Sequence, residues 1–263
     1  MRLKDKVVIV TGAGQTDGDG MGNGRAVAVQ FARDGARLML ANRRMQSMQG
    51  TLDHIRAEGF DAEAMVCDVA EEDDCAALAA ATLKTFGRID VLHNSVGIAA
   101  SDGDTATLDL ATWNKLMDVN VTGAMLLSKH VLPAMRDQQS GVITHVSSTA
   151  AIMSLPIIAY KTSKMALNEF TRWLAFENAP HNIRCNVLML GFIDTPMAME
   201  GYVKATGLPR DELRQRRDKK VPMGRMGTPW ETAEVAVFLA SDQSSYITGA
   251  VIPMDGGLHT RVG

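Results

Sequence analysis

Apolar residues form two patterns along the chain: short continuous runs typical of buried strands, and a helical period typical of amphipathic helices. Short runs rich in β-branched residues, such as 6–10 and 183–188, have strand character, whereas 25–33 carries apolar residues at a helical period. The predicted strands are 6–10, 37–41, 62–66, 90–93, 141–146, 183–188 and 249–253, and the predicted helices are 25–33, 45–58, 73–86, 108–135, 160–177 and 230–240. Strand and helix therefore alternate from one end of the chain to the other.

This alternation predicts an α/β fold with a doubly wound parallel sheet of the Rossmann type. About seven strands fit the length, with helices on both faces of the sheet. No linker, low-complexity segment or repeat of fixed period divides the chain, and 263 residues can be filled by one α/β core. We therefore expect residues 1–263 to form a single dinucleotide-binding domain.

Residues 197–228 differ from the rest of the chain in composition, because methionines flank the charged run 210–220. This pattern is typical of a mobile lid over a substrate site, with a charged outer face. A charged run is more often the solvated face of a helix, and that remains the default interpretation of 210–220.

Composition narrows the class of partner. A hydrophobic content of 46% and a net charge of -3 are ordinary for a globular protein and favour neither nucleic acid nor an anionic membrane surface. No apolar stretch approaches the roughly 18 residues of a membrane span, and no apolar signal segment precedes the first strand. Cys67, Cys75 and Cys185 have neither metal-ligand spacing nor the even count of a disulfide framework. We expect a cytoplasmic protein that acts on a small molecule and holds no metal.

The first predicted strand runs into a loop rich in glycine, and a helix follows. Gly12, Gly14, Gly22 and Gly24 allow the backbone to approach a pyrophosphate, which the positive end of the helix dipole would hold. Loops of this kind are often only flexible connectors. The position directly after the first strand favours a dinucleotide site.

The ends of the next two strands carry the residues that bear on the choice of cofactor. Asn42, Arg43 and Arg44 follow the second strand, where an acidic residue would bind the ribose hydroxyls of NAD and an arginine would pair with a 2′-phosphate. These residues favour NADP over NAD, although two arginines can also simply begin a solvated helix. Asp68, after the third strand, is placed to meet the adenine, with capping of the next helix as the competing role for nearby acids.

A tyrosine and a lysine at helical spacing are the candidate chemical groups. Tyr160 and Lys164 lie four residues apart, so a helix would place them on one face. An ammonium beside a phenol lowers the pKa of the phenol, which suits an acid/base that moves a proton to or from an alcohol. Two serines, Ser147 and Ser148, end the preceding strand, and Asn120 lies within the predicted helix 108–135. The same spacing would also arise from an ordinary amphipathic helix face.

Taken in order, these residues resemble the short-chain dehydrogenase/reductase family over nearly the whole chain. The resemblance rests on Thr11-Gly12-Ala13-Gly14 with Gly22 and Gly24, Asp68, Asn94, Asn120, Ser147-Ser148, Tyr160, Lys164, Asn186 and Met254-Asp255-Gly256-Gly257. It implies an NAD(P)-dependent oxidoreductase that interconverts a secondary alcohol and its ketone. It also implies a homotetramer assembled through the helices 108–135 and 160–177.

The resemblance further implies a role for each matching residue. Tyr160 would be the acid/base, Lys164 would lower its pKa and bind the nicotinamide ribose, and Ser148 would orient the substrate oxygen. Asn120 would support a water-linked proton relay behind Lys164. The residues that would bind the cofactor are Gly12, Gly14, Gly22, Asn23, Gly24, Asn42, Arg43, Asp68, Val69, Asn94, Gly97, Tyr160, Lys164, Ile193 and Thr195.

Three features depart from the family pattern. The loop between Gly14 and Gly22 is several residues longer than usual, which changes the backbone available to meet the pyrophosphate. Leu190 stands where the family typically has proline. The interval before Tyr160 also differs: counting back by the usual number of residues selects Ser147, whereas strand register selects Ser148, which we prefer.

Three alternatives to the NADP-preferring enzyme stay open at this stage. They are an NAD-linked dehydrogenase that runs toward oxidation, a 3-oxoacyl thioester reductase, and a dinucleotide-binding sensor without catalysis. The full set of Asn120, Ser148, Tyr160 and Lys164 argues against the sensor. Five residues could line an adaptable pocket for a bulky or cyclic apolar ketone or could equally fill the core: Met153, Leu155, Met189, Met197 and Met199.

Overall fold

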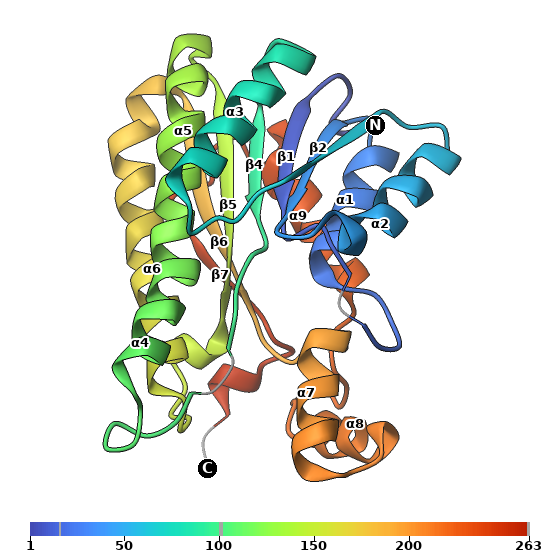
Figure 1. The fold of residues 1–263 in the computed structure, drawn as a ribbon, viewed down its shortest axis with the longest axis vertical. Helices are drawn as coiled ribbons and strands as arrows, with labels where there is room; N and C mark the ends of the chain where they lie inside the picture. Colours follow the sequence, from blue (N-terminus) through green and yellow to red (C-terminus); the bar gives the residue numbers. More distant parts are fainter. Residues whose placement is uncertain (16, 100–101, 262–263) are drawn as a thin grey trace.

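A seven-stranded parallel sheet forms the centre of the molecule in the computed structural model, which describes residues 1–15, 17–99 and 102–261. The strand order is β3-β2-β1-β4-β5-β6-β7 (Figure 1). The strands are β1 (Val7–Thr11), β2 (Arg37–Asn42), β3 (Ala62–Val66), β4 (Val91–Asn94), β5 (Gly141–Ser148), β6 (Ile183–Leu190) and β7 (Val251–Met254). All neighbouring pairs are parallel, which confirms the predicted doubly wound fold.

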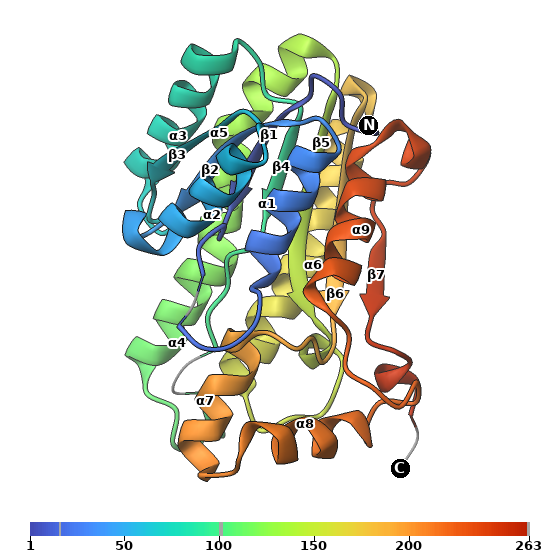
Figure 2. The same cartoon turned by 90° about the vertical axis from the view of Figure 1, so that its right-hand side faces the viewer.

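Helices cover both faces of the sheet (Figures 1 and 2). One face is covered by α1 (Asn23–Arg33), α2 (Met45–Ala57) and α9 (Pro229–Ala240), and the other by α3 (Glu72–Phe86), α5 (Gly123–Gln138) and α6 (Ile158–Asn178). Each layer has its own apolar core, built by side chains from alternate strand positions. Every residue of β1 is buried, as expected of a parallel strand with helices on both sides. None of the described helices is both long and apolar enough to cross a bilayer.

The predicted strands β1 and β4 each extend one residue further than the apolar pattern indicated. Thr11 and Asn94 pair across these two strands, and the Thr11 hydroxyl donates a hydrogen bond of 2.8 Å to the Asn94 side-chain oxygen. Two polar residues that form a hydrogen bond with each other can extend a buried strand. A prediction based on apolar residues alone ends such a strand too early.

The predicted helix 108–135 is two α-helices joined by a π-helical turn. α4 (Leu110–Met117) leads into η1 (Asp118–Thr122), and α5 begins at Gly123. The backbone is helical throughout, so the apolar periodicity of the stretch hides the change of winding. Asn120 lies at the centre of η1.

Two helices of the region 197–228 lie beyond the carboxyl ends of the strands. α7 (Pro196–Thr206) and α8 (Arg210–Asp218) form a separate layer below the sheet in Figures 1 and 2. A small apolar cluster holds this layer together, with Met199, Leu213 and Met226 at its centre. The remaining short elements are 3-10 turns: η2 (Thr149–Ala151), η3 (Ala179–His181), η4 (Asp242–Ser244) and η5 (Leu258–Thr260).

Candidate active site

A cavity of about 330 Å³ opens at the carboxyl edge of the sheet. Its walls come from the glycine-rich loop with the start of α1, the ends of β4, β5 and β6, and residues of α6, α7 and α8. Ligands of open α/β sheets bind at this edge, where the strand order reverses beside β1. The cavity therefore lies where the fold predicts a dinucleotide.

Tyr160 faces this cavity from the first turn of α6. Its hydroxyl is close enough to the Ser148 hydroxyl, at the end of β5, for Ser148 to influence its ionisation. Burial raises the pKa of Tyr160, and the neighbouring Ser148 hydroxyl offsets this only in part. Lys164 is not among the groups that shift this pKa, so its expected lowering of the pKa of Tyr160 stays a prediction.

Lys164 lies one turn further along α6 and is almost fully buried. Its Nζ lies 5.8 Å from the centroid of the Tyr160 ring and donates a hydrogen bond of 2.9 Å to the Val146 carbonyl. Burial lowers the pKa of Lys164 to about 8, so the amine is largely protonated at neutral pH. The predicted helical pair therefore meets as expected, with the ammonium beside the ring.

The two serines at the end of β5 point to different places. The Ser147 hydroxyl donates a hydrogen bond of 3.2 Å to the Lys164 carbonyl and is buried. Ser148 accepts one of 3.2 Å from the Ala150 amide and meets Tyr160. Successive residues of a strand point to opposite faces of the sheet, so the two serines face different surroundings. Ser148, the residue selected by strand register, is the one beside the phenol of Tyr160.

Asn120 joins three segments behind the cavity. Its Oδ1 accepts a hydrogen bond of 2.8 Å from the Ile98 amide, and its Nδ2 donates to the Ile98 carbonyl and the Ser163 hydroxyl, each at 3.0 Å. The π-helical turn re-aims this side chain, a use of such turns that recurs at functional sites. Gly97 lies between it and Lys164, because an added Cβ would stand 2.8 Å from Lys164 Nζ and 3.5 Å from Asn120 Oδ1.

Two residues that sequence reasoning missed hold the start of α6. The Asp102 carboxylate accepts hydrogen bonds from the amides of Ala159 at 3.1 Å and Tyr160 at 2.7 Å. Lys161 Nζ donates to backbone carbonyls of the loop that follows β5, at 2.9 Å to Ala151 and 2.7 Å to Met153. The acidic Asp-Gly-Asp sequence at 102–104 is the only local signal that could have suggested this distant helix cap.

The start of α1 fits a pyrophosphate. Gly22 precedes the helix, no side chain caps it, and no acidic residue lies in its first turn. Gly24 packs against the preceding loop so closely that a Cβ would stand 2.0 Å from the Gly12 carbonyl oxygen. Free amides at a helix start and a close backbone approach are what a phosphate group requires. Four glycines and one asparagine of this segment line the cavity: Gly12, Gly14, Gly22, Asn23 and Gly24.

The extended glycine loop folds back on itself and reaches α7. The Gln15 side chain accepts a hydrogen bond of 3.0 Å from the Gly22 amide and donates one of 3.1 Å to the Gly20 carbonyl. Gly18 packs against Glu200, since a Cβ there would lie 2.6 Å from Glu200 Cγ. Thr16, part of the predicted insertion, lies outside the described residues.

The predicted ribose-binding residues follow β2 at the sheet edge. The Asn42 side chain donates to the Ser47 hydroxyl at 2.9 Å and accepts from the Arg43 amide at 2.9 Å. Arg43 and Arg44 are exposed, and neither guanidinium pairs with any described residue. They do not line the cavity, but the preceding residue, Asn42, packs against Gly14, which does.

Asp68, Val69 and Asn94 also lie outside the cavity lining. Asp68 is half-buried and accepts a hydrogen bond of 3.1 Å from the Ala70 amide, and Val69 is buried against Gly123. The Asn94 side chain turns into the sheet, where it accepts from Thr11 and from the Val96 amide. Residues 95–97, directly after Asn94, line the cavity, and contact of Asn94 itself with the cofactor stays a prediction.

Ile193 and Thr195 line the opposite wall. Thr195 begins α7, and its hydroxyl accepts a hydrogen bond of 3.2 Å from the Ala198 amide. Among the five candidate pocket residues, Met153, Leu155 and Met197 line the cavity, whereas Met189 and Met199 are buried in the core. Three of the five residues therefore line the pocket, and the other two fill the core.

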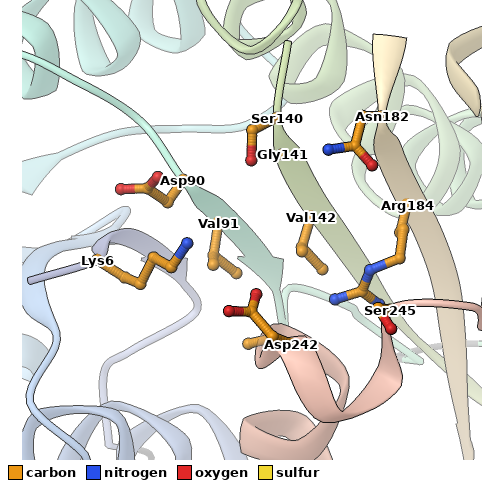
Figure 3. Close-up of a pocket in the computed structure, with 11 residues that line it drawn as sticks. Lys6, Asp90, Val91, Ser140, Gly141, Val142, Asn182, Arg184, Asp242 and Ser245 are labelled. Carbon is orange, nitrogen blue, oxygen red and sulfur yellow. The ribbon is translucent and has the colours of Figure 1, made fainter. Parts of the chain in front are cut away.

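A second, smaller cavity of about 140 Å³ lies at the amino ends of β4, β5 and β6 (Figure 3). Figure 3 shows Lys6, Asp90, Asp242 and Arg184 around it. Arg184 is already bonded there to the carbonyls of Leu239, at 2.8 Å, and of Ser241, at 3.1 Å. This cavity contains none of the predicted site residues, and it is at the edge of the sheet that α/β proteins do not use for ligands. Among the described residues, no group of three His, Cys, Asp or Glu could hold a metal ion.

Known proteins resemble this chain over nearly its whole length. A family model described as "Enoyl-(Acyl carrier protein) reductase" matches residues 18–259. The chain is 37% identical over 254 residues to the short-chain reductase protein NovJ of Streptomyces niveus, covering 97% of this chain and 94% of that protein. It is 34% identical over 259 residues to the 3-oxoacyl-(acyl-carrier-protein) reductase FabG of Thermotoga maritima, covering 98% and 99%.

A solved structure of levodione reductase superimposes with a TM-score of 0.93 at 30% identity, covering 99% of this chain and 100% of that one. These matches define an oxidoreductase with a Rossmann-type sheet. The chain belongs to the short-chain dehydrogenase/reductase family, as its motifs suggested, and is an oxidoreductase of CH–OH and C=O groups. Membership implies a nicotinamide dinucleotide as its cofactor.

Proposed function

We propose that this chain interconverts a secondary alcohol and its ketone, with Tyr160 as the general acid/base and NADP as the preferred cofactor. The observation that carries the proposal is the meeting of the Ser148 and Tyr160 hydroxyls in the cavity that the start of α1 also lines. The nicotinamide, when bound, supplies or accepts the hydride. Tyr160 gives or takes the proton at the substrate oxygen, and the Ser148 hydroxyl donates a hydrogen bond to that oxygen.

Lys164 and Asn120 support this pair from behind the cavity. The protonated Lys164 amine lies beside the Tyr160 ring and is the group that would bind the nicotinamide ribose. Asn120 fixes Ser163, the residue before Lys164, and would take part in a water-linked proton relay. Both side chains also tie α6 to its surroundings, Lys164 through the Val146 carbonyl and Asn120 through Ser163 and the backbone of Ile98.

The preference for NADP rests on the exposed guanidinium groups of Arg43 and Arg44. A charge-assisted hydrogen bond to a 2′-phosphate is worth about 1.5 to 3 kcal/mol, so a single contact would favour NADP roughly tenfold or more. The measurement is kcat/KM with each cofactor at low and high salt. Asn42→Asp is expected to invert the preference, because a carboxylate repels the phosphate and accepts bonds from ribose hydroxyls.

Arg43→Ala is expected to weaken the use of NADP while leaving that of NAD nearly unchanged. Arg56→Ala, at an exposed arginine further along α2, is the matched control and should alter neither. Equal or better efficiency with NAD at low salt would favour the NAD-linked dehydrogenase that runs toward oxidation.

A 3-oxoacyl thioester reductase is the second candidate, and the similarity to FabG of T. maritima supports it. Initial rates with neutral ketones, secondary alcohols and a 3-oxoacyl thioester would separate the two enzymes. Turnover of none of them, together with tight cofactor binding, would favour a dinucleotide-binding sensor.

Three further properties belong to the same proposal. The single domain of residues 1–263 would use 197–228 as a mobile lid, because α7 and α8 contribute to the cavity wall. Homotetramers would form through the exposed sides of α5 and α6. The chain would act in the cytoplasm, where its buried free cysteines stay reduced.

A further inference from the structure

Arg217 is a buried cation within a run of charges that the sequence assigns to solvent. It is 7% exposed, and Leu213, one turn earlier, is the other buried residue of α8. The two side chains therefore share the inner face of the helix. Arg216, the preceding residue, has a side chain that is 60% exposed and pairs with Glu212.

Aromatic rings hold the guanidinium of Arg217 on two sides. Its carbon Cζ lies 4.5 Å from the ring centroid of Tyr202 and 5.1 Å from that of Phe192. Nη1 donates a hydrogen bond of 2.9 Å to the Ala198 carbonyl and contacts Met199 Sδ at 3.4 Å. Stacked guanidinium groups keep their in-plane N–H donors free for a ligand.

In the part of the chain that the structure describes, no carboxylate is paired with this guanidinium, although burial lowers the pKa of Arg217 and the charge of Asp194 offsets this in part. Arg210 on the same helix pairs with Asp194 and Glu200, and Arg214 also pairs with Asp194. Among the residues that the structure describes, none forms an ion pair with Arg217, and Nη1 is the one nitrogen with a hydrogen-bond partner. Burial of a charge without a counterion is costly, so such a group usually meets an anion or a polar ligand.

The cavity of the proposed active site is where that anion would bind. Arg217, Tyr202 and Phe192 all line the cavity that Tyr160 faces. Tyr202 is close enough to both Arg217 and Tyr160 to influence their ionisation. Because Tyr160 and Arg217 line one cavity, a ligand whose oxygen meets Tyr160 can extend toward the guanidinium.

We propose that Arg217 binds an anionic group of the substrate, so that the ketone or alcohol accepted by this enzyme is an oxo acid or hydroxy acid. This inference rests on the proposed function, because it places the reacting carbonyl at Tyr160. A carboxylate can accept two parallel hydrogen bonds from the planar guanidinium. The apolar side chains of Met153, Leu155 and Met197 would surround the body of such a substrate.

The test compares three oxo acids with their neutral methyl esters: acetoacetate, levulinate and benzoylformate. These acids place the carboxylate at different separations from the ketone, so the unknown length of the natural substrate is covered. The wild-type enzyme is expected to prefer at least one acid over its ester about tenfold or more in kcat/KM, the size of one charge-assisted hydrogen bond.

The readout for the variants is the ratio of acid to ester efficiency, which does not depend on overall activity. Arg217→Met should lower the ratio to about one, and Arg217→Lys should retain part of the preference. Arg216→Met is the matched control, since it removes the neighbouring exposed guanidinium, and it should keep the wild-type ratio. Thermal unfolding of each variant shows whether the loss of stacking on Tyr202 and Phe192 has unfolded α8.

Two kinetic results would overturn the inference while leaving the proposed function intact. One is a wild-type enzyme that reduces the esters as well as or better than all three acids. The other is an equal loss on acid and ester in Arg217→Met, which would make the residue a structural clamp. A rise in the dissociation constant of NADP in this variant, with an unchanged acid to ester ratio, would assign the guanidinium to the cofactor and also overturn the inference.

Calorimetric titration of the NADP-loaded protein with the three acids gives a readout without turnover. Binding of an acid by the wild type that weakens about tenfold or more in Arg217→Met supports the inference even where no ketone is reduced. Failure of the wild type to bind or reduce any of the acids, while neutral ketones are turned over, excludes it. Turnover of no ketone or alcohol at all counts against the proposed function separately.

Discussion

Neighbouring residues of the same type make different contacts in this protein, because secondary structure points their side chains in different directions. Ser148 meets the phenol of Tyr160, while Ser147, one position earlier on the same strand, bonds to a backbone carbonyl. Arg217 faces the cavity, while Arg216 is on the outer side of α8. Strand alternation separates the serines, and the helical turn of about 100° per residue separates the arginines.

Replacement of Tyr160 by phenylalanine tests the acid/base at the residue scale. Burial raises the pKa of the phenol, so Tyr160 is protonated at neutral pH and ready to donate to a ketone oxygen. Loss of a positioned acid should lower kcat by about 10²- to 10⁴-fold and leave the dissociation constant of NADP nearly unchanged. Tyr246→Phe, at a fully exposed tyrosine, serves as the control. Most of the activity surviving in Tyr160→Phe would contradict the mechanism.

The buried His93 side chain is expected to make the folded protein less stable in acid. It is fully buried in β4, packs edge-on against Phe31, and has no hydrogen-bond partner for either ring nitrogen among the described residues. Burial lowers the pKa of His93 from 6.5 to about 4. Between these pH values the unfolded chain binds a proton that the folded chain does not, so stability is lost as pH falls.

The expected contribution of His93 is a decrease of about 1.4 kcal/mol in the free energy of unfolding for each pH unit across that window. Urea unfolding at a series of pH values measures it. His93→Leu should make the pH dependence shallower by this amount, whatever the substitution does to stability at neutral pH. The same slope in wild type and variant would show that protonation of His93 is not what destabilises the fold in acid.

At the scale of elements, the catalytic face of α6 depends on a cap supplied from a distant loop. Ile157, the residue before α6, offers no side chain to the helix start, and Asp102 takes that role through the Ala159 and Tyr160 amides. Asp102→Ala should cost about 1 kcal/mol of stability, as the loss of a helix cap usually does. It should also lower kcat more than it raises KM, because Tyr160 loses its backbone anchor.

Asp109→Ala provides a control for this cap. Asp109 caps α4 through a 2.8 Å hydrogen bond from the Thr112 amide, so its loss should cost similar stability without moving Tyr160. Asp102→Asn keeps an acceptor oxygen and should recover part of the activity. Equal effects of the two alanine substitutions on kcat would show that Asp102 matters only for stability. Thermal unfolding and steady-state kinetics of the three variants decide this.

The elements and much of the site were predictable from the sequence, but contacts between distant segments were not. Short runs rich in β-branched residues, alternating with helical periods, predicted the sheet, and the spacing of Tyr160 and Lys164 placed both on one helix. Asp102 gave no local sign of its partner, because the cap is made across more than fifty residues. The π-helical turn at Asn120 preserves the apolar pattern, and the inward turn of Arg217 is masked by the charges around it.

At the scale of the whole molecule, the outer side of α5 and α6 carries apolar residues that no described part of the chain covers. The exposed fractions are 37% for Met125, 43% for Met165, 60% for Trp173 and 73% for Phe176. The rings of Trp173 and Phe176 lie 5.5 Å apart, and the two helices run side by side in Figures 1 and 2. Contiguous exposed aromatic residues of this kind usually mark an interface between proteins.

We expect this side to be buried between copies of the chain in a homotetramer. A symmetric interface brings each residue near its own counterpart, so Trp173→Glu combined with Phe176→Glu would place like charges together in an apolar contact. Sedimentation should show a four-chain species for the wild type and a smaller species for the double variant. Met223→Glu, at another exposed apolar residue, should leave the assembly intact. A wild-type protein that sediments as a 28.4 kDa monomer at micromolar concentration would rule out this assembly.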